Sequence, residues 1–227
     1  MDHANRGRGL QWADKDSHVS RIPLFPLGTV LMPGVPLPLH IFEKRYFDLI
    51  TECLHSETEF GVVYYDGREI QRVGCTARIT QVLGSTEDGK LDVMTAGMRR
   101  FAVREIIEEK AYLEAEVDFF DDEDTATGEE MHALARKCVA RLKRLAAYVD
   151  SKQVLDFLDR LEIKPLSFIL ASSSGFTMTE RQSFLEMTSI RERLLASTRS
   201  LKQLLSRAQT AKAVARIIGG NGHLKAL

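Results

Sequence analysis

Residues 22–42, IPLFPLGTVLMPGVPLPLHIF, decide how the first half of the chain folds. The stretch is apolar, yet it holds five of the six prolines: Pro23, Pro26, Pro33, Pro36 and Pro38. Proline fixes φ and lacks the N–H that a helix interior or a central strand needs. We therefore expect short extended pieces that change direction at a Pro33-Gly34 turn and lie as an edge segment across a core.

The residues that follow this stretch predict one helix and then a sheet. Residues 43–55 have a helical period, with the stripe Phe42, Tyr46, Ile50 and Cys53. Beyond them, short runs alternate apolar and polar residues, and Gly97 predicts a bulge or bend between two of these runs. The runs are 60–65, 73–83, 91–95, 99–104 and 111–119, with turns at Asp66-Gly67 and Asp88-Gly89. This pattern indicates an antiparallel sheet, closed or half-closed into a barrel.

The composition changes at residues 121–130, which hold six acidic residues. We interpret this segment as a solvated linker or a helix N-terminus. The period after it is helical: helices are predicted at 131–149, 154–161 and 166–171. Capping-box patterns predict two further helix starts, the last helix running from Ile190 to about Ile218. These patterns are Thr177 with Glu180 and Ser189 with Glu192.

These patterns predict an α+β fold in three parts. Residues 1–20 form a poorly ordered or loosely docked leader, residues 21–120 a β-rich domain, and residues 121–227 a helical domain that ends in a long helix.

Composition narrows the class of protein. The net charge of −1 gives no overall attraction to nucleic acid or membrane. Three separated cysteines, Cys53, Cys75 and Cys138, fit a reducing compartment. The polar N-terminus and the lack of a long apolar run predict a cytoplasmic protein that does not contact membranes.

No motif for catalysis or cofactor binding is found in the sequence. The one Gly-Lys pair, Gly89-Lys90, is followed by Leu91, so there is no phosphate-binding loop. The six histidines are scattered, and the serines at 172–174 fit turn chemistry between helices. We expect no catalytic residues, no metal site and no cofactor.

Residues 21–120 resemble the N-terminal substrate-binding domain of Lon proteases. The resemblance rests on the order and spacing of several segments, and the later helices, with Glu192-Arg193-Leu194-Leu195, extend it to about residue 215. The segments are IPLFPL at 22–27, Pro33-Gly34, PLPL at 36–39, Arg45-Tyr46, VGCTARI at 73–79 and TAGMRRF at 95–101.

The resemblance implies a PUA-like pseudobarrel followed by a helical bundle. In full-length Lon this region recognises unfolded or tagged substrates and precedes an ATPase and a Ser–Lys peptidase. The 227 residues contain neither a Walker motif nor the peptidase serine motif. We therefore expect a non-catalytic polypeptide-binding module, an adaptor or holdase with a protease or chaperone partner.

Candidate peptide contacts are the apolar residues Met32, Val35 and Leu37 beside the prolines, for which burial in the core is an equal alternative. Arg100 is expected to pair with a carboxylate inside the domain rather than with a ligand. A small-molecule site between the domains also stays open.

The alternative function is RNA binding, because PUA-like folds elsewhere bind RNA. From Ser189 onward the chain has eight basic residues and one acidic residue. Arg199, Lys202, Arg207 and Lys212 are the candidate contacts, beside Arg191, Arg193 and Arg216 in the same helix. A solvated helix face explains the same charges. Oligomeric state is not predicted from the sequence.

Overall fold

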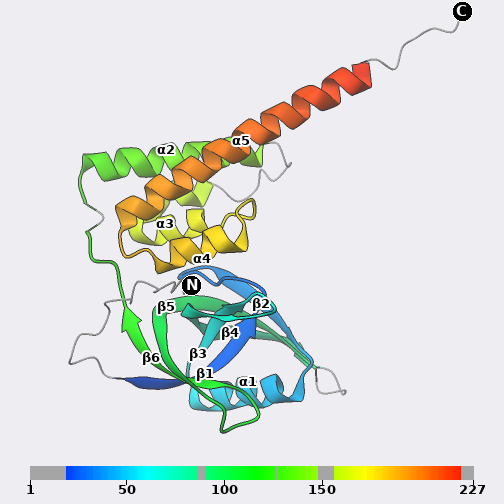
Figure 1. Cartoon of the computed structure of the whole chain (residues 1–227), viewed down its shortest axis with the longest axis vertical. Coiled ribbons are helices and arrows are strands. Elements are labelled where there is room, and N and C mark those ends of the chain that lie inside the picture. Colours follow the sequence, from blue (N-terminus) through cyan, green and yellow to red (C-terminus); the bar gives the residue numbers. More distant parts are fainter. Residues whose placement is uncertain (1–18, 86–89, 126, 148–155, 221–227) are drawn as a thin grey trace, which may run out of the picture.

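The computed structural model describes residues 19–85, 90–125, 127–147 and 156–220. A β-domain and a helical domain lie one above the other along the long axis (Figure 1). The leader before residue 19, the Asp88-Gly89 turn and the start of the predicted 154–161 helix lie outside the described residues.

Six strands build the β-domain: β1 (Ser20–Leu27), β2 (Pro36–Ile41), β3 (Phe60–Tyr65), β4 (Ile70–Ser85), β5 (Leu91–Ile107) and β6 (Glu114–Phe120). Their order in the sheet is β2-β5-β4-β3-β1-β6, and a further β5–β6 pairing closes five of them into a ring. The predicted barrel is therefore confirmed, although β1 and β3 run parallel and the sheet is mixed.

The prolines of β1 are tolerated because each half of this strand pairs on one side only. Residues 20–23 pair with β6, and residues 24–27 pair with β3. Proline cannot donate to a ladder, so it needs positions where the N–H side faces away from a partner strand. β2, which contains Pro36 and Pro38, pairs only with β5 among the described strands. The expected edge character is thus confirmed for β2, whereas β1 lies between β3 and β6 within the ring.

Gly97 lies where the backbones of two segments meet. A Cβ atom at this position would lie 2.1 Å from the carbonyl oxygen of Met32. The Pro33-Gly34 turn next to it is confirmed, with Gly34 at a φ of 76°. β5 runs through Gly97 as one continuous strand. The interruption predicted there is a shift in the register between β4 and β5, opposite Thr76. The hydroxyl of Thr76 accepts a hydrogen bond from the Arg99 N–H.

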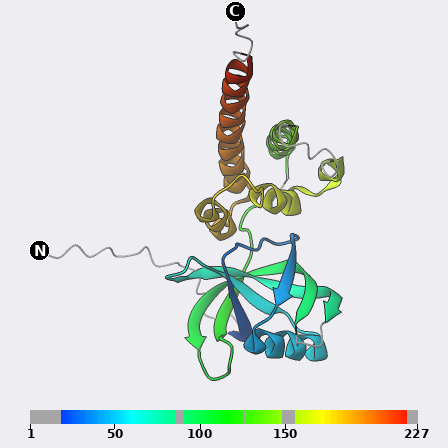
Figure 2. The ribbon, with the colours of Figure 1, turned by 90° about the vertical axis from the view of Figure 1, so that its right-hand side faces the viewer.

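The helices are α1 (Lys44–Ser56), α2 (Glu129–Ala146), α3 (Ile163–Ala171), α4 (Met178–Glu186) and α5 (Ile190–Gly220), with a 3₁₀-helix η1 at Asp156–Arg160. α1 lies against the β-domain, and the others form the second domain, from which α5 extends (Figure 2). The predicted capping box at Thr177 is present in both directions. None of the helices in the described ranges combines the length and the apolar character that a membrane span requires.

Three local predictions are wrong. Phe42 precedes α1 and is 66% exposed, so it does not belong to the buried stripe of that helix. The alternation of the run at 73–83 predicts Leu83 on the same face as Val73 and Cys75. Leu83 is exposed instead, because register shifts after Ile79 break the alternation of β4. The part of the predicted 154–161 helix that is described is the 3₁₀-helix η1.

The core has two parts. A small cluster around Phe101 fills the inside of the five-stranded ring. Gly74 leaves room for the phenyl group of Phe101, because a Cβ atom at position 74 would lie 2.5 Å from that group. The larger cluster runs from α1 and β2 through to the helical domain. Packing of this kind supplies most of the stability of both domains.

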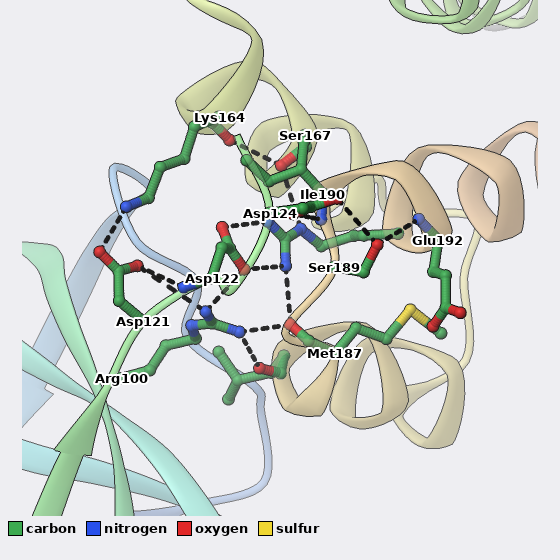
Figure 3. A network of polar contacts seen from close by, with 12 residues as sticks. Arg100, Asp121, Asp122, Asp124, Lys164, Ser167, Met187, Ser189, Ile190 and Glu192 are labelled. Atoms are coloured by element: carbon green, nitrogen blue, oxygen red, sulfur yellow. Dashed lines mark hydrogen bonds and ion pairs between the residues drawn. The ribbon is translucent and has the colours of Figure 1, made fainter. Parts of the chain in front are cut away.

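Polar contacts join the two domains at one buried carboxylate (Figure 3). Asp122, which follows β6, accepts hydrogen bonds from Arg100 of β5 at 2.7 Å and from two nitrogens of Arg193 of α5 at 2.8 and 3.0 Å. The side chains of all three are at most 1% exposed. Arg100 does pair with a carboxylate, but with Asp122 at the domain junction and not with one inside the β-domain as predicted. The interpretation of Asp122 as part of a solvated linker is wrong as well.

Candidate functional site

A wide groove lies on the β-domain, between the ends of β1 and β2. Its volume is about 670 Å³, within the range of ligand sites. We call it the β1–β2 groove. It is lined by Phe25, Pro26, Leu27, Pro38, Leu39, His40, Ile41, Phe42, Glu43, Arg45, Tyr46, Tyr65, Ile70 and Leu113.

Stacked aromatic rings hold one wall of the β1–β2 groove in place. The rings of Phe25 and Tyr46 stack with centroids 4.0 Å apart, and Phe60 supports Phe25 from the core at 6.1 Å. The guanidinium of Arg45 lies 4.6 Å from the centroid of Tyr46. Burial raises the pKa of the Tyr46 phenol, so this ring stays neutral and serves as a rigid surface.

Two aromatic side chains at the rim are open to solvent. Phe42 is 66% exposed in the connection between β2 and α1, and Tyr65 is 41% exposed at the end of β3. Tyr65 directly precedes the Asp66-Gly67 turn, whose Asp66 carboxylate accepts hydrogen bonds from the next backbone N–H groups, those of Arg68 and Glu69. The turn thus fixes the backbone next to Tyr65, and the start of α1 fixes the backbone next to Phe42.

The charged groups of the groove are paired with one another or with a neighbour. Arg45 and Glu43 form an ion pair at 2.7 Å, and His40 Nδ1 lies 2.7 Å from a carboxylate oxygen of Asp92. The lining therefore presents apolar and aromatic surface with little net charge. Such a surface suits an uncharged apolar ligand better than an ion.

The three predicted peptide contacts do not line this groove. Met32 is completely buried, beneath the Pro33-Gly34 turn, so its side chain is not accessible. Val35 and Leu37 are half-buried and pack against the larger core cluster. The accessible apolar surface lies further along the same segment, at Pro38 and Phe42. Sequence reasoning missed Phe42 because it fits the spacing of the following helix, and missed Tyr65 because it ends a buried strand.

The four predicted nucleic-acid contacts, Arg199, Lys202, Arg207 and Lys212, are exposed on α5. At about 100° per residue these positions point in different directions around the helix axis and do not form one stripe. Arg193, a fifth basic residue of this helix, is buried against Asp122.

The three cysteines, and Ser172 and Ser173 of the serine cluster, have structural surroundings. All three cysteines are buried, and burial raises the pKa of the Cys75 thiol to about 12. The hydroxyls of Ser172 and Ser173 donate to backbone carbonyls one turn earlier, as turn serines do. Among the described residues, no three His, Cys or acidic side chains lie close enough to bind a metal ion together.

A smaller cavity of about 350 Å³ lies at the domain junction, where the sequence left a small-molecule site open. Arg99, Lys164 and Phe168 are among its lining residues, and the Lys164 ammonium is 2.5 Å from Asp121. Arg100, at its inner end, has its hydrogen bonds occupied by Asp122 and by the carbonyls of Leu185 and Met187. This arrangement is that of a structural junction.

Comparison with known proteins identifies one family. The model of the ATP-dependent protease La (LON) substrate-binding domain matches residues 21–203. The chain is 25% identical over 202 residues to the Lon protease of Anaeromyxobacter dehalogenans, and 26% identical over 194 residues to Lon protease 2 of Myxococcus xanthus. These alignments cover 80% and 76% of the chain but 23% and 22% of the relatives, so the chain spans about a quarter of their length.

Solved structures agree with the fold. The Lon N-terminal domain protein of Xanthomonas campestris is 27% identical, with a TM-score of 0.61, over 82% of this chain and 98% of that one. The N-terminal domain of the Mycobacterium avium complex Lon protease superposes with a TM-score of 0.67 at 20% identity, over 81% and 98% of the two chains. The shared fold is the β-domain with its helical domain.

Proposed function

The chain belongs to the family of the ATP-dependent protease La (LON) substrate-binding domain, and from this premise we propose that it is a non-catalytic module that binds polypeptides. The β1–β2 groove takes apolar segments of unfolded or partly unfolded chains. In this role the protein acts in the cytoplasm as an adaptor or holdase, which passes its clients to a protease or chaperone partner.

The observation that carries the proposal is the exposed pair Phe42 and Tyr65 at the rim of an apolar groove. Burying large apolar side chains is favourable by about 1.5–3 kcal/mol each, so leaving aromatic rings in solvent beside an apolar groove is typical of an interaction surface. The lining of the groove carries little net charge, which also favours an apolar polypeptide segment as the ligand. The lack of a phosphate-binding loop and of an activated nucleophile in the sequence supports a role without chemistry.

Replacement of the exposed phenyl group tests this function. The Phe42→Ser variant should bind a reduced and alkylated, permanently unfolded protein about tenfold more weakly than wild type, equivalent to about 1.4 kcal/mol. Phe157→Ser is the matched control, because Phe157 is 41% exposed on η1, outside the groove. Binding would be measured by fluorescence anisotropy, and the fold of both variants would be checked by thermal unfolding.

If the proposed function is correct, Phe157→Ser binds the unfolded protein as tightly as wild type does. The dissociation constant also changes little between about 0.05 M and about 0.5 M salt. Equal loss in both variants would place the clients elsewhere on the surface. A lack of binding to any unfolded protein would contradict the function itself, and steep weakening with salt would point to an electrostatic partner such as RNA.

A further inference from the structure

We infer that the β1–β2 groove recognises the side chains of its client and does not add the client as a further strand of the sheet. This inference rests on the proposed function and specifies how the same groove works. Many peptide-binding domains with a free sheet edge gain affinity from main-chain hydrogen bonds to that edge. Here proline occupies the edge positions that would have to donate them.

The hydrogen bonds next to β2 show which of its residues face outward. Gly97 of β5 donates its N–H to the carbonyl of Val35 at 3.0 Å, and β2 continues from this pair in antiparallel register. Hydrogen-bonded positions alternate along such a pair. Leu37, Leu39 and Ile41 therefore bond towards β5, while Pro36, Pro38 and His40 direct their backbone groups to the free edge.

The other border of the groove follows the same rule. Leu24 of β1 donates its N–H to the carbonyl of Leu113 at 2.7 Å, on the side away from β3. Pro26 lies two residues further, so its ring nitrogen is on that same side. The second half of β1 pairs only with β3 among the described strands. The residue of β1 whose backbone nitrogen faces outward within the groove is therefore also a proline, Pro26.

A client strand laid along β2 would thus find one N–H donor, that of His40, among three outward positions. The carbonyls of Pro36 and Pro38 remain, but the client's own carbonyls would face proline rings and lose their partners. A buried carbonyl without a hydrogen bond is unfavourable, because it gives up its bond to water without a replacement. Prolines on an edge strand block strand addition for this reason.

Side-chain contacts remain as the source of affinity, and the charge of the lining selects the occupant. Glu43 neutralises Arg45, and the other residues that line the groove are apolar, aromatic or His40, so the lining offers no net charge to match one on the client. Phe42 and Tyr65 add exposed aromatic surface. The complementary occupant is an uncharged polypeptide segment that carries aromatic or aliphatic side chains, read without a fixed main-chain register.

Ester replacement in the client separates the two binding modes. An uncharged peptide rich in Phe, Leu and Ile would be compared with two versions in which alternate amides, at even or at odd positions, are esters without the N–H. All three should bind wild-type protein with dissociation constants within about threefold of one another, whereas Phe42→Ser weakens all three alike. A tenfold loss in either ester version would overturn the inference.

The parent peptide also separates this inference from the proposed function. If it fails to bind, or binds Phe42→Ser as well as wild type, the proposed function of the groove is wrong. If it binds through Phe42 but one ester version does not, only the side-chain mode is wrong. A monomeric mass in sedimentation of the unliganded protein would exclude a second copy of the chain as the occupant of the groove. A dimer that Phe42→Ser dissociates would replace the client by a second copy and contradict the inference.

Restoring the missing donors provides the converse test. The double variant Pro36→Val with Pro38→Val presents two new N–H groups at the free edge. It should bind the parent peptide several-fold more tightly than at least one ester version, or associate with itself through the opened edge. A folded double variant that treats the three peptides alike and stays monomeric would show that the prolines do not set the binding mode.

Discussion

At the domain junction two guanidinium groups share one carboxylate. Arg100 and Arg193 approach Asp122 from the β-domain and the helical domain, and the ring of Phe168 lies within 5.1 Å of both guanidinium carbons. Burial lowers the pKa of Arg100, with Asp122 opposing that shift, and arginine remains protonated even so. Asp122 is therefore the buried carboxylate that compensates both cations, and the exposed Asp121 adds a longer contact with Arg100 at 3.9 Å.

Removing this carboxylate should destabilise the whole protein. Asp122→Ala leaves both guanidiniums without their buried counter-charge, and Arg100 keeps only the 3.9 Å contact with the exposed carboxylate of Asp121, which costs at least about 3 kcal/mol. The matched control is Asp121→Ala, because Asp121 is 68% exposed, its pair with Lys164 is open to solvent, and its contact with Arg100 is long, at 3.9 Å. We expect a loss below about 1 kcal/mol there. Urea unfolding of both variants measures the difference, and similar losses would show that the junction does not depend on Asp122.

Sequence alone could not separate these two neighbours. Asp121 and Asp122 have the same side chain in the same acidic run, and every local signal for that run is of a solvated segment. Asp122 is buried only because residues 22 and 71 positions away reach it. In contrast, a carboxylate partner for Arg100 could be predicted, since a strand residue in an alternating run must point inward or outward, but the position of that partner at the domain junction could not.

At the scale of elements, predictions succeed where the deciding interaction is local. The Asp66-Gly67 turn and the Thr177–Glu180 capping box depend on residues at most three apart, and both are found. The limits of α1 follow its apolar spacing. Phe42 fits that spacing as well, but the helix begins after it, so an exposed groove residue was assigned to the core.

Asp124 caps α5 from the linker, a contact that the sequence did not reveal. Its carboxylate accepts hydrogen bonds from the N–H groups of Ile190 and Arg191 at 2.7 and 3.1 Å and from the Ser189 hydroxyl at 2.9 Å. Burial alone would raise the pKa of Asp124, but these bonds outweigh it and hold the pKa below its ordinary value. A carboxylate at a helix N-terminus is stabilising for the same electrostatic reason.

The Asp124 cap makes a pH-dependent contribution to stability. Because the folded pKa lies below the unfolded value of 3.8, the contribution is complete well above that pH and is lost as the pH falls through it towards the folded value. Asp124→Ala should cost about 1 kcal/mol at neutral pH, and its difference from wild type should shrink below about pH 4.

Chemical unfolding across this pH range measures the effect. Glu123→Ala is the control, because the Glu123 side chain is exposed and its backbone N–H, which bonds the carbonyl of Thr188, is retained. An Asp124→Ala difference that stays constant down to pH 3 would contradict the role of the ionised carboxylate.

At the scale of the whole molecule, the candidate site lies on the β-domain, whereas the basic helix that the sequence singled out belongs to the helical domain. The β1–β2 groove gathers five segments: the ends of β1 and β2, the start of α1, the β3–β4 turn and the connection before β6. The helical domain and α5 stand at the other end of the β-domain (Figure 1). The α+β class and the family resemblance were predictable from patterns along the chain, but the groove arises only when the ring closes.

The central claim is that polypeptide clients occupy the β1–β2 groove, and photo-crosslinking tests it most directly. An unfolded apolar polypeptide that carries benzophenone groups would be irradiated with the wild-type protein, and the crosslinked residues would be mapped by mass spectrometry. Crosslinks should concentrate on residues 38–46, 65–70 and 113, and Phe42→Ser should reduce them together. Crosslinks confined to α5, or to Val35 and Leu37 without the groove residues, would contradict the account.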